Sequence, residues 1–209
     1  MVSLRKLCSL GSSATIEDKP DIARLRAAFG EGPADALATI LELKNGFYVF
    51  NQALHVFSDA GTANEPSIVE WNGRSCWKNR YGELARIGTC FAQDAFGNQF
   101  CWDNGTVSLF DADTAVYTLV APSIDEWARL VLEDPDRWVH RGACESWQAT
   151  NGHLLPGHRL VARVSRLVGG TYSGKNAAVE EVVGGMRYKG MRRLGLQMHP
   201  RSRVHWSPE

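Results

Sequence analysis

The chain has 209 residues, of which 44% are hydrophobic and 22% charged, and its 23 Lys and Arg balance its 23 Asp and Glu. This length suits one large domain with a substantial core, so we treat residues 1–209 as a single domain. The composition excludes a disordered, collagen-like or coiled-coil chain. No run of 18 apolar residues is present, so we expect neither a transmembrane helix nor a membrane partner.

The zero net charge conceals an uneven distribution along the chain. Residues 1–158 hold 13 basic and 20 acidic residues, whereas residues 159–209 hold 10 basic and 3 acidic. A basic segment could bind nucleic acid, but these residues lack the interleaved aromatic side chains of a single-strand binder. We expect the basic C-terminal part to pack against the acidic remainder of its own chain, and we do not expect nucleic acid as a partner.

The cysteines indicate a reducing environment. The chain has an odd number of them, widely spaced and without a C-x-x-C pair, namely Cys8, Cys76, Cys90, Cys101 and Cys144. This pattern favours a reduced, cytoplasmic protein over a disulfide framework, a zinc ribbon or a thioredoxin-like site. Cys90 and Cys101 fall in or beside expected strands, where they would pack as small hydrophobic residues. The apolar stretch within residues 1–14 is too short and polar for a signal peptide.

Two helices are expected near the N-terminus, over about 20–29 and 33–45. Pro20 opens the first helix and Gly30 closes it, while Pro33 suits the first turn of the second.

Strands are expected over 47–50 and 54–57, because both segments are rich in aromatic and β-branched residues. A polar loop over 59–66 follows. We then expect a helix over 67–82 and a strand over 84–88.

The strongest local pattern is a hairpin formed by segments 99–103 and 106–110 on either side of Asn104-Gly105. Asn-Gly favours a type I′ turn, whose twist matches that of the flanking strands. Together with a strand over 115–120, the hairpin predicts a three-stranded antiparallel meander.

Helical signals return after the meander. Ser123 and Glu126 have the spacing of a capping box at the start of a helix. The remaining elements are expected to be a helix over 136–150, a strand over 159–168, a helix over 175–184 and a strand near 194–198. Because helices precede and follow an antiparallel meander without βαβ alternation, we predict an α+β fold with N-terminal helices, a central antiparallel sheet and flanking C-terminal helices.

One glycine-rich segment has the spacing of a phosphate-binding loop. Gly169, Gly174 and Lys175 lie after an expected strand and before an expected helix, and such loops hold phosphates with backbone amides and a lysine. However, Asn176 occupies the position of the magnesium-binding hydroxyl. Too little chain follows to form the rest of a nucleotide-binding sheet, so we interpret the segment as a turn.

No other pattern predicts an enzyme. The six histidines are scattered without metal-site spacing, and no G-x-S-x-G sequence is present. The carboxylates Asp94, Asp103, Asp111 and Asp113 lie at hairpin ends, where aspartate commonly bonds its own backbone. We therefore predict no catalytic residue, no metal site and no cofactor.

Several short motifs follow one another in a recognisable order. They are Asn45-Gly46, Trp71-Asn72, Trp77 to Tyr81, Ile87-Gly88, Asp94 to Phe100, the Asn104-Gly105 hairpin, Ser123 to Trp127, Trp147 to Gly152, Arg159-Leu160, Gly169-Gly170 to Asn176, and Met186 to Tyr188. Over about 33–200, this order resembles the SUKH superfamily, and within it the bacterial branch that is similar to the yeast cell-wall-synthesis regulators (Smi/Knr type).

The resemblance implies an α+β domain without enzymatic activity whose partner is another protein. Bacterial SUKH proteins act as immunity proteins, which bind and neutralise toxins delivered by neighbouring cells. An acidic body could attract a basic toxin and accelerate association. The acidic loop residues that we expect to contribute to partner binding are Asp59, Glu65, Glu70, Asp111 and Asp113.

Two alternatives stay open. A domain of the same fold could act as a regulatory or scaffold protein in cell-wall or stress signalling. Less in keeping with the sequence, the chain could bind a nucleotide through Gly169–Lys175.

Overall fold

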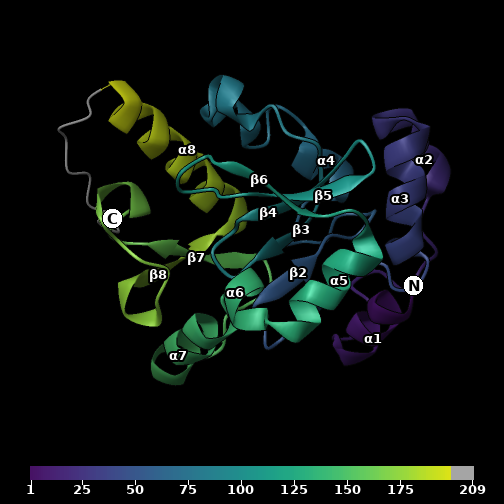
Figure 1. The fold of residues 1–209 in the computed structure, drawn as a ribbon, viewed down its shortest axis with the longest axis horizontal. Helices are drawn as coiled ribbons and strands as arrows, with labels where there is room; N and C mark the ends of the chain where they lie inside the picture. The colour runs from purple at the N-terminus through teal and green to yellow at the C-terminus, as the bar shows by residue number, and fades with distance from the viewer. Residues whose placement is uncertain (199–209) are drawn as a thin grey trace.

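The computed structural model describes residues 1–198 (Figure 1). Its α-helices are α1 (Val2–Leu10), α2 (Ile22–Phe29), α3 (Glu31–Leu41), α4 (Ile68–Asn72), α5 (Ile124–Glu133), α6 (Pro135–Val139), α7 (Arg141–Asn151) and α8 (Val182–Met198). Its strands are β1 (Phe47–Val49), β2 (Leu54–Val56), β3 (Thr89–Asp94), β4 (Gln99–Asp103), β5 (Thr106–Phe110), β6 (Tyr117–Ala121), β7 (His158–Ala162) and β8 (Ala177–Glu181).

A six-stranded antiparallel sheet forms the centre of the molecule. Its strands follow chain order from β1 to β6, and β7 and β8 form a separate antiparallel pair. Asn104 and Gly105 both have positive φ at the β4–β5 turn, as a type I′ hairpin requires. The expected meander is thus confirmed, and helices on either side of it make the fold α+β, as predicted.

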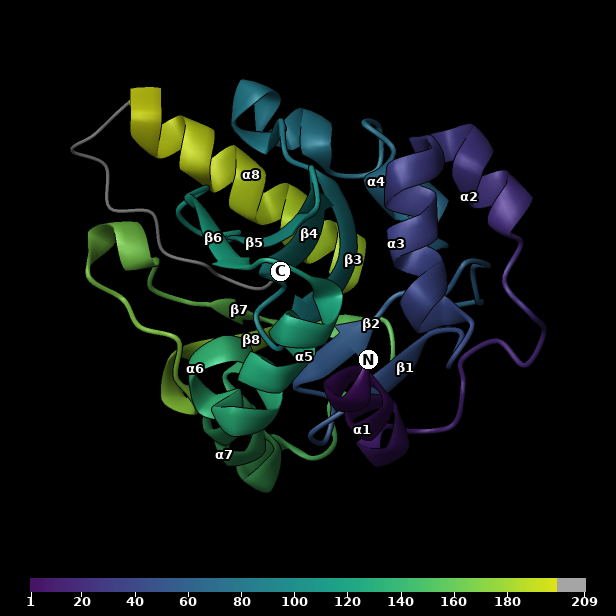
Figure 2. The same cartoon turned by 45° about the vertical axis from the view of Figure 1, so that its right-hand side comes forward.

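Helices cover both faces of this sheet (Figures 1 and 2). On one face, Trp127 of α5 packs edge-on against Phe91 and Phe100 of the sheet. On the other face, Trp77 packs between Trp71 of α4 and sheet residue Phe110. These large side chains are fully buried, so aromatic packing on both faces holds the sheet between its helical layers.

Several expected elements differ in the structure. The helix expected over 67–82 ends at Asn72 because Gly73 follows it, and short 3-10 helices at Lys78–Arg80 and Gly82–Ala85 take its place. The strand expected over 84–88 is therefore wrong, and β3 begins only at Thr89. The helix expected over 136–150 is divided into α6 and α7 at His140, whose backbone is left-handed.

The C-terminal elements differ most. The expected helix over 175–184 is wrong, because residues 177–181 instead pair with β7 along their whole length. The expected strand near 194–198 is also wrong, since these residues lie in α8. Glycines within α8 lower its local helix propensity, but Gly190 allows a close approach, because a Cβ there would lie 2.7 Å from the Arg80 carbonyl oxygen. Helix α1 was not anticipated; Leu4 and Leu7 bury its inner face.

Candidate partner-binding surface

Asp59 was expected to reach a partner, but the structure buries it. Only 5% of the residue is exposed. Its carboxylate accepts hydrogen bonds from Asn45 Nδ2 at 2.6 Å and from the Asp21 backbone N–H at 2.9 Å. Asp59 therefore fixes the start of its loop and the N-terminal end of α2 to the body of the fold.

Glu65 is likewise buried, in a polar group beneath its loop. Its carboxylate accepts hydrogen bonds from the Tyr48 hydroxyl and from the Gly157 backbone N–H. His55 Nε2 lies 3.5 Å from this carboxylate, yet burial and the nearby Arg159 lower the pKa of His55 well below 6.5. The pKa of Glu65 is raised, again mainly by burial. At neutral pH, His55 is thus uncharged, and this contact is not an ion pair.

Asp111 and Asp113 hold the turn between β5 and β6 to the C-terminal part of the chain. Asp113 is fully buried and forms an ion pair with Arg192 of α8, whose side chain is also buried. Asp111 pairs with Arg166 and accepts a hydrogen bond from the Tyr172 hydroxyl at 3.0 Å. Both carboxylates therefore act within the chain.

Glu70 is the exposed member of the expected set. With Ser67 it forms a capping box at the N-terminus of α4, and the hydrogen bonds from Ser67 lower its pKa. The other four carboxylates of the set are buried or half-buried and already bonded inside the chain, so they are poor contacts for an incoming protein. The five carboxylates consequently do not form one exposed acidic face.

The basic C-terminal part packs against the body of the fold within the described residues. Besides the pairs of Arg166 and Arg192, Arg187 donates to the Cys76 carbonyl and Arg193 to the Thr114 carbonyl. Lys189 is buried and bonds the Phe96 carbonyl, and burial lowers its pKa to about 8. Arg201 and Arg203 lie outside the described residues.

The glycine-rich segment lacks the geometry of a phosphate-binding loop. It leads into β8 through a 3-10 turn, Gly174–Asn176, rather than into a helix. The Asn176 side chain bonds the backbone of Val164 and the carbonyl of Thr171. Since a phosphate loop needs the amides at a helix N-terminus, this arrangement supports the interpretation as a turn.

A second buried polar group lies at the turn between β3 and β4. The Asp94 carboxylate accepts hydrogen bonds from the backbone N–H groups of Phe96 and Asn98 and from Asn98 Nδ2, at 2.7 to 2.9 Å. His140 Nε2 lies 3.5 Å from the same carboxylate, and burial raises the pKa of Asp94. The bonds close the turn, as expected for an aspartate at a hairpin end. Within residues 1–198, no cluster of three or more His, Cys, Asp or Glu is arranged to hold a metal ion.

The two edges of the central sheet differ in how they are covered. At the β1 edge, the segment 12–16 runs alongside and donates backbone hydrogen bonds from Ser12 to Tyr48 and from Thr15 to Gly46, each at 2.8 Å. At the β6 edge, the strand has a neighbour on one side only, β5, within the described part of the chain.

The side chains of the β6 edge are exposed, and all but Thr118 are largely apolar. Val116, Tyr117 and Leu119 expose 55%, 37% and 67% of their surfaces, and no charged residue or proline occurs from Val116 to Ala121. A bulge within β6, at Val120, disturbs its pairing with β5 and so limits the regular open stretch to residues 116–119. Natural proteins usually shield such edges with charges, prolines or a covering segment. We call residues 116–119 the open edge.

Sequence reasoning predicted the strand at the open edge but not its exposure. Alternation from Ala115 to Val120 is weak, and a run of uncharged residues gives no sign of which strand ends a sheet. Natural edge strands often carry a charge or a proline, and residues 116–121 have neither, so the sequence offered no signal that this strand ends the sheet.

Comparisons with known proteins show the fold without naming a family. No protein-family model matches the chain, and no curated protein matches it. Among solved structures, the chain is similar to Atu4351 from Agrobacterium tumefaciens, with a TM-score of 0.59 and 10% sequence identity over 90% of this chain and 87% of that one. No helix among residues 1–198 is long and apolar enough to cross a membrane. At this identity, the likeness extends to the overall fold alone.

Proposed function

We propose that this chain is a non-enzymatic protein-binding domain, and specifically an immunity protein that neutralises a bacterial toxin by direct binding. The open edge supports the binding role, because an extended segment of a partner can add to it as a further strand. The resemblance to the SUKH superfamily supports the toxin as partner.

The open edge can supply both affinity and selectivity. The backbone groups along the outer side of β6, which no strand pairs within residues 1–198, can bond an added strand, while alternate side chains contact that strand and so select its sequence. Leu119 contributes most, since covering a largely exposed leucine stabilises a complex by up to about 2 kcal/mol. The partner segment that fits this edge is therefore extended, rich in β-branched or aromatic residues and free of charge at its centre.

The experiment is affinity purification of the tagged chain from its native host, with mass spectrometry of the co-eluting proteins. We expect one near-stoichiometric partner that carries a toxin-like C-terminal domain. Expression of that domain should stop bacterial growth, and co-expression of this chain should restore it.

Matched variants then test the surface. Leu119→Lys places a charge on the open edge and should abolish rescue. The matched control is Leu155→Lys, which changes a leucine of similar exposure, 61%, in the loop before β7 and should leave rescue intact. Rescue by both variants would leave immunity in place and remove the open edge as its site. A captured partner without toxic activity would contradict immunity and favour the regulatory role.

The nucleotide alternative has a separate test. Because Lys175 lies in a 3-10 turn before a strand, we expect no rise in Tm when millimolar ATP and magnesium are added. A rise that Lys175→Ala abolishes would overturn the non-enzymatic assignment.

A further inference from the structure

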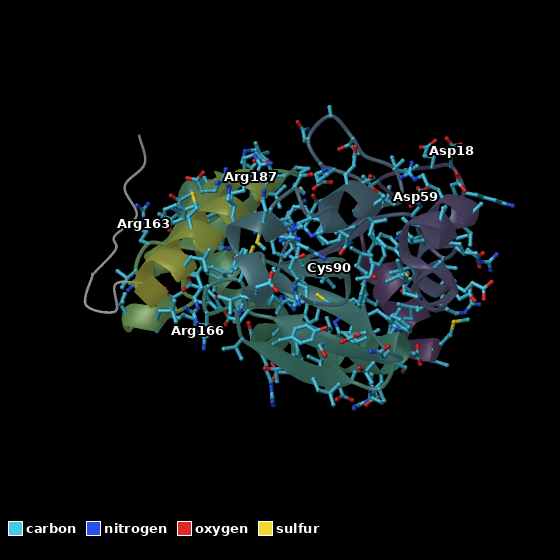
Figure 3. The ribbon with its side chains drawn as sticks, turned by 90° about the horizontal axis from the view of Figure 1, so that it is seen from above. Asp18, Asp59, Cys90, Arg163, Arg166 and Arg187 are labelled. Atoms are coloured by element: carbon cyan, nitrogen blue, oxygen red, sulfur yellow. The ribbon has the colours of Figure 1, made fainter. Side chains whose placement is uncertain are left out.

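Two buried thiols face each other inside the sheet. Cys90 of β3 and Cys101 of β4 are directly opposite in register, and their Sγ atoms lie 3.1 Å apart. Both residues are fully buried, and Figure 3 shows Cys90 in the middle of the molecule. We propose that Cys90 and Cys101 are a modification site at which hydrogen peroxide forms a reversible intramolecular disulfide.

Cys90 and Cys101 occupy a non-hydrogen-bonded position of the antiparallel β3–β4 ladder, where opposed side chains lie closest together. The Cys90 backbone N–H donates to Asn72 Oδ1, and its carbonyl accepts from Asn72 Nδ2, each at 2.8 Å. Since both backbone groups of Cys90 point to Asn72, neither bonds Cys101 on β4. Opposed residues without mutual backbone bonds have Cα atoms about 4.5 Å apart, which lies within the range that a disulfide spans.

The other cysteines lack this arrangement. Cys8 lies in α1, Cys76 in the segment after α4 and Cys144 in α7, and Cys144 Sγ lies beside the Asn51 carbonyl and the Gln148 side chain. Burial raises the pKa of Cys76 to about 11, so its thiolate is scarce at neutral pH. The opposed pair is therefore the place in the described chain where oxidation can end in an intramolecular bond.

The pair also has an asymmetry that assigns roles to its two sulfurs. Burial disfavours the thiolate at Cys90, but the hydrogen bond with the Cys101 thiol and the charge of Lys78 outweigh it, so the pKa of Cys90 is lowered. Burial and the adjacent Cys90 sulfur raise the pKa of Cys101 well above the usual value. The geometry agrees, because Lys78 Nζ donates to Asn72 Oδ1 at 3.1 Å and the same oxygen accepts from the Cys90 backbone N–H, which places the cation on the Cys90 side of the pair. Because the thiolate is the nucleophile, Cys90 attacks first and Cys101 resolves.

A surface groove lies at the end of β3 and β4 beside the pair, although neither cysteine lines it. Its lining includes Lys78, Gly88, Thr89 and Trp102, and the last two directly adjoin Cys90 and Cys101 in sequence. Hydrogen peroxide is small enough to travel from such a groove through a brief opening of the strand end. A bulky disulfide oxidant would need far more of the sheet to open.

The chemistry balances with peroxide as the single co-reactant. Cys90 first gives up its proton, and its thiolate attacks one peroxide oxygen. The O–O bond breaks, the hydroxide that leaves takes up the proton released by Cys90 to form the first water, and Cys90 becomes a sulfenic acid. The Cys101 sulfur then attacks the Cys90 sulfur, the S–S bond forms as the S–O bond breaks, and a second water leaves. Overall, two thiols and one peroxide give one disulfide and two waters, and a dithiol reductant reverses the modification.

The test uses the full chain, reduced and then treated with hydrogen peroxide. Trypsin leaves both cysteines in one peptide, residues 87–129, so the disulfide lowers its mass by two hydrogens. We expect this loss, a fall in free thiols of the denatured protein from five to three, and a rise in Tm of roughly 5 °C. Dithiothreitol should reverse all three changes.

Variants and competing products decide the result. Cys101→Ala should leave Cys90 trapped as a sulfenic acid that a dimedone probe labels, whereas Cys144→Ala, which removes another buried thiol, should still form the disulfide. A wild-type chain whose thiol count stays at five, or whose peptide gains oxygen without losing hydrogen, would overturn the proposal. The wild-type measurement needs no variant to fold.

Discussion

The two edges of the central sheet solve the same problem in opposite ways. At β1, the chain lays its own segment 12–16 along the strand and satisfies the outer backbone groups of residues 45–48. At β6, exposed Val116 and Leu119 border a strand that has one neighbour within residues 1–198. A protein that covers one edge and leaves the other apolar has a direction in which its sheet can be extended.

This contrast separates stability from binding. The covered edge is bonded within the chain, so changes there should act on the free energy of unfolding. The side chains of the open edge are exposed, so changes there should act on association. The ion pair that joins α8 to the turn before β6 lies next to the open edge, but changes in it should act on the free energy of unfolding, because it holds that turn in place.

The largest effect is expected at this support. Arg192→Ala would leave the fully buried Asp113 carboxylate without its ion-pair partner, and breaking a buried pair costs about 3–5 kcal/mol. Urea unfolding followed by circular dichroism measures the loss. The control is Arg129→Ala, which removes exposed pairs with Glu126 and Glu133 and should cost less than about 1 kcal/mol. Equal losses in the two variants would show that Asp113 is not dependent on α8.

The covered edge is expected to respond next. Gly46 lies before β1 with a φ of +73°, and a Cβ there would meet Ser58 Cβ at 2.6 Å. Strain and overlap together should make Gly46→Ala cost about 3 kcal/mol. The matched change is Gly105→Ala, where φ is +89° but the space is open, and it should cost about 1 kcal/mol. If Gly105→Ala proves as costly, steric contact at the covered edge adds nothing.

Comparison of these regions also shows how far the sequence predicts the structure. The β4–β5 hairpin was predictable because Asn104-Gly105 restricts the turn locally. The strand at β8 was not, because residues 177–181 acquire their conformation by pairing with β7, a long-range contact that helical periodicity cannot reveal. Helix α8 was missed because glycines have low helix propensity and, from sequence alone, indicate an interrupted helix. In the structure they allow close packing, as at Gly190.

The candidate site was harder to predict than the fold. Acidic residues in loops are usually solvated, so Asp59 and Glu65 were natural choices for a partner-binding face. Their burial depends on donors from distant segments, such as Asn45 and Gly157, which a single sequence does not bring together. The open edge depends on strand order, which the sequence leaves undetermined.

A smaller effect should follow pH beneath the covered edge, where His55 stacks on Tyr48. Because the pKa of His55 is lowered in the folded state, His55 takes up a proton near pH 6.5 in the unfolded chain but stays uncharged at that pH in the folded chain. Stability is thus present above pH 6.5 and falls by up to about 1.4 kcal/mol per pH unit below it. The raised pKa of Glu65 acts oppositely, because its contribution is lost as pH rises through the folded pKa.

Because the two groups act oppositely, the contribution of His55 is isolated by comparing the pH dependence of stability in the wild type and in a variant without the histidine. Unfolding free energies of the wild type and of His55→Asn should be compared from pH 7.5 to 5.5. The variant should lose less stability than the wild type as pH falls from 6.5, and parallel curves would mean that His55 is protonated in the folded state. Arg159 must stay unchanged, since its charge also lowers the pKa of His55.

The smallest effect on stability is expected at the open edge. Leu119 is 67% exposed, so Leu119→Lys should change the free energy of unfolding by no more than about 0.5 kcal/mol. The added charge would still shield the edge against an incoming strand, as lysine does on natural edge strands, so association should fall while folding is unaffected. Urea unfolding of the isolated variant measures the first quantity. A loss above 1 kcal/mol would mean that the edge is covered in solution, and the contrast with β1 would then disappear.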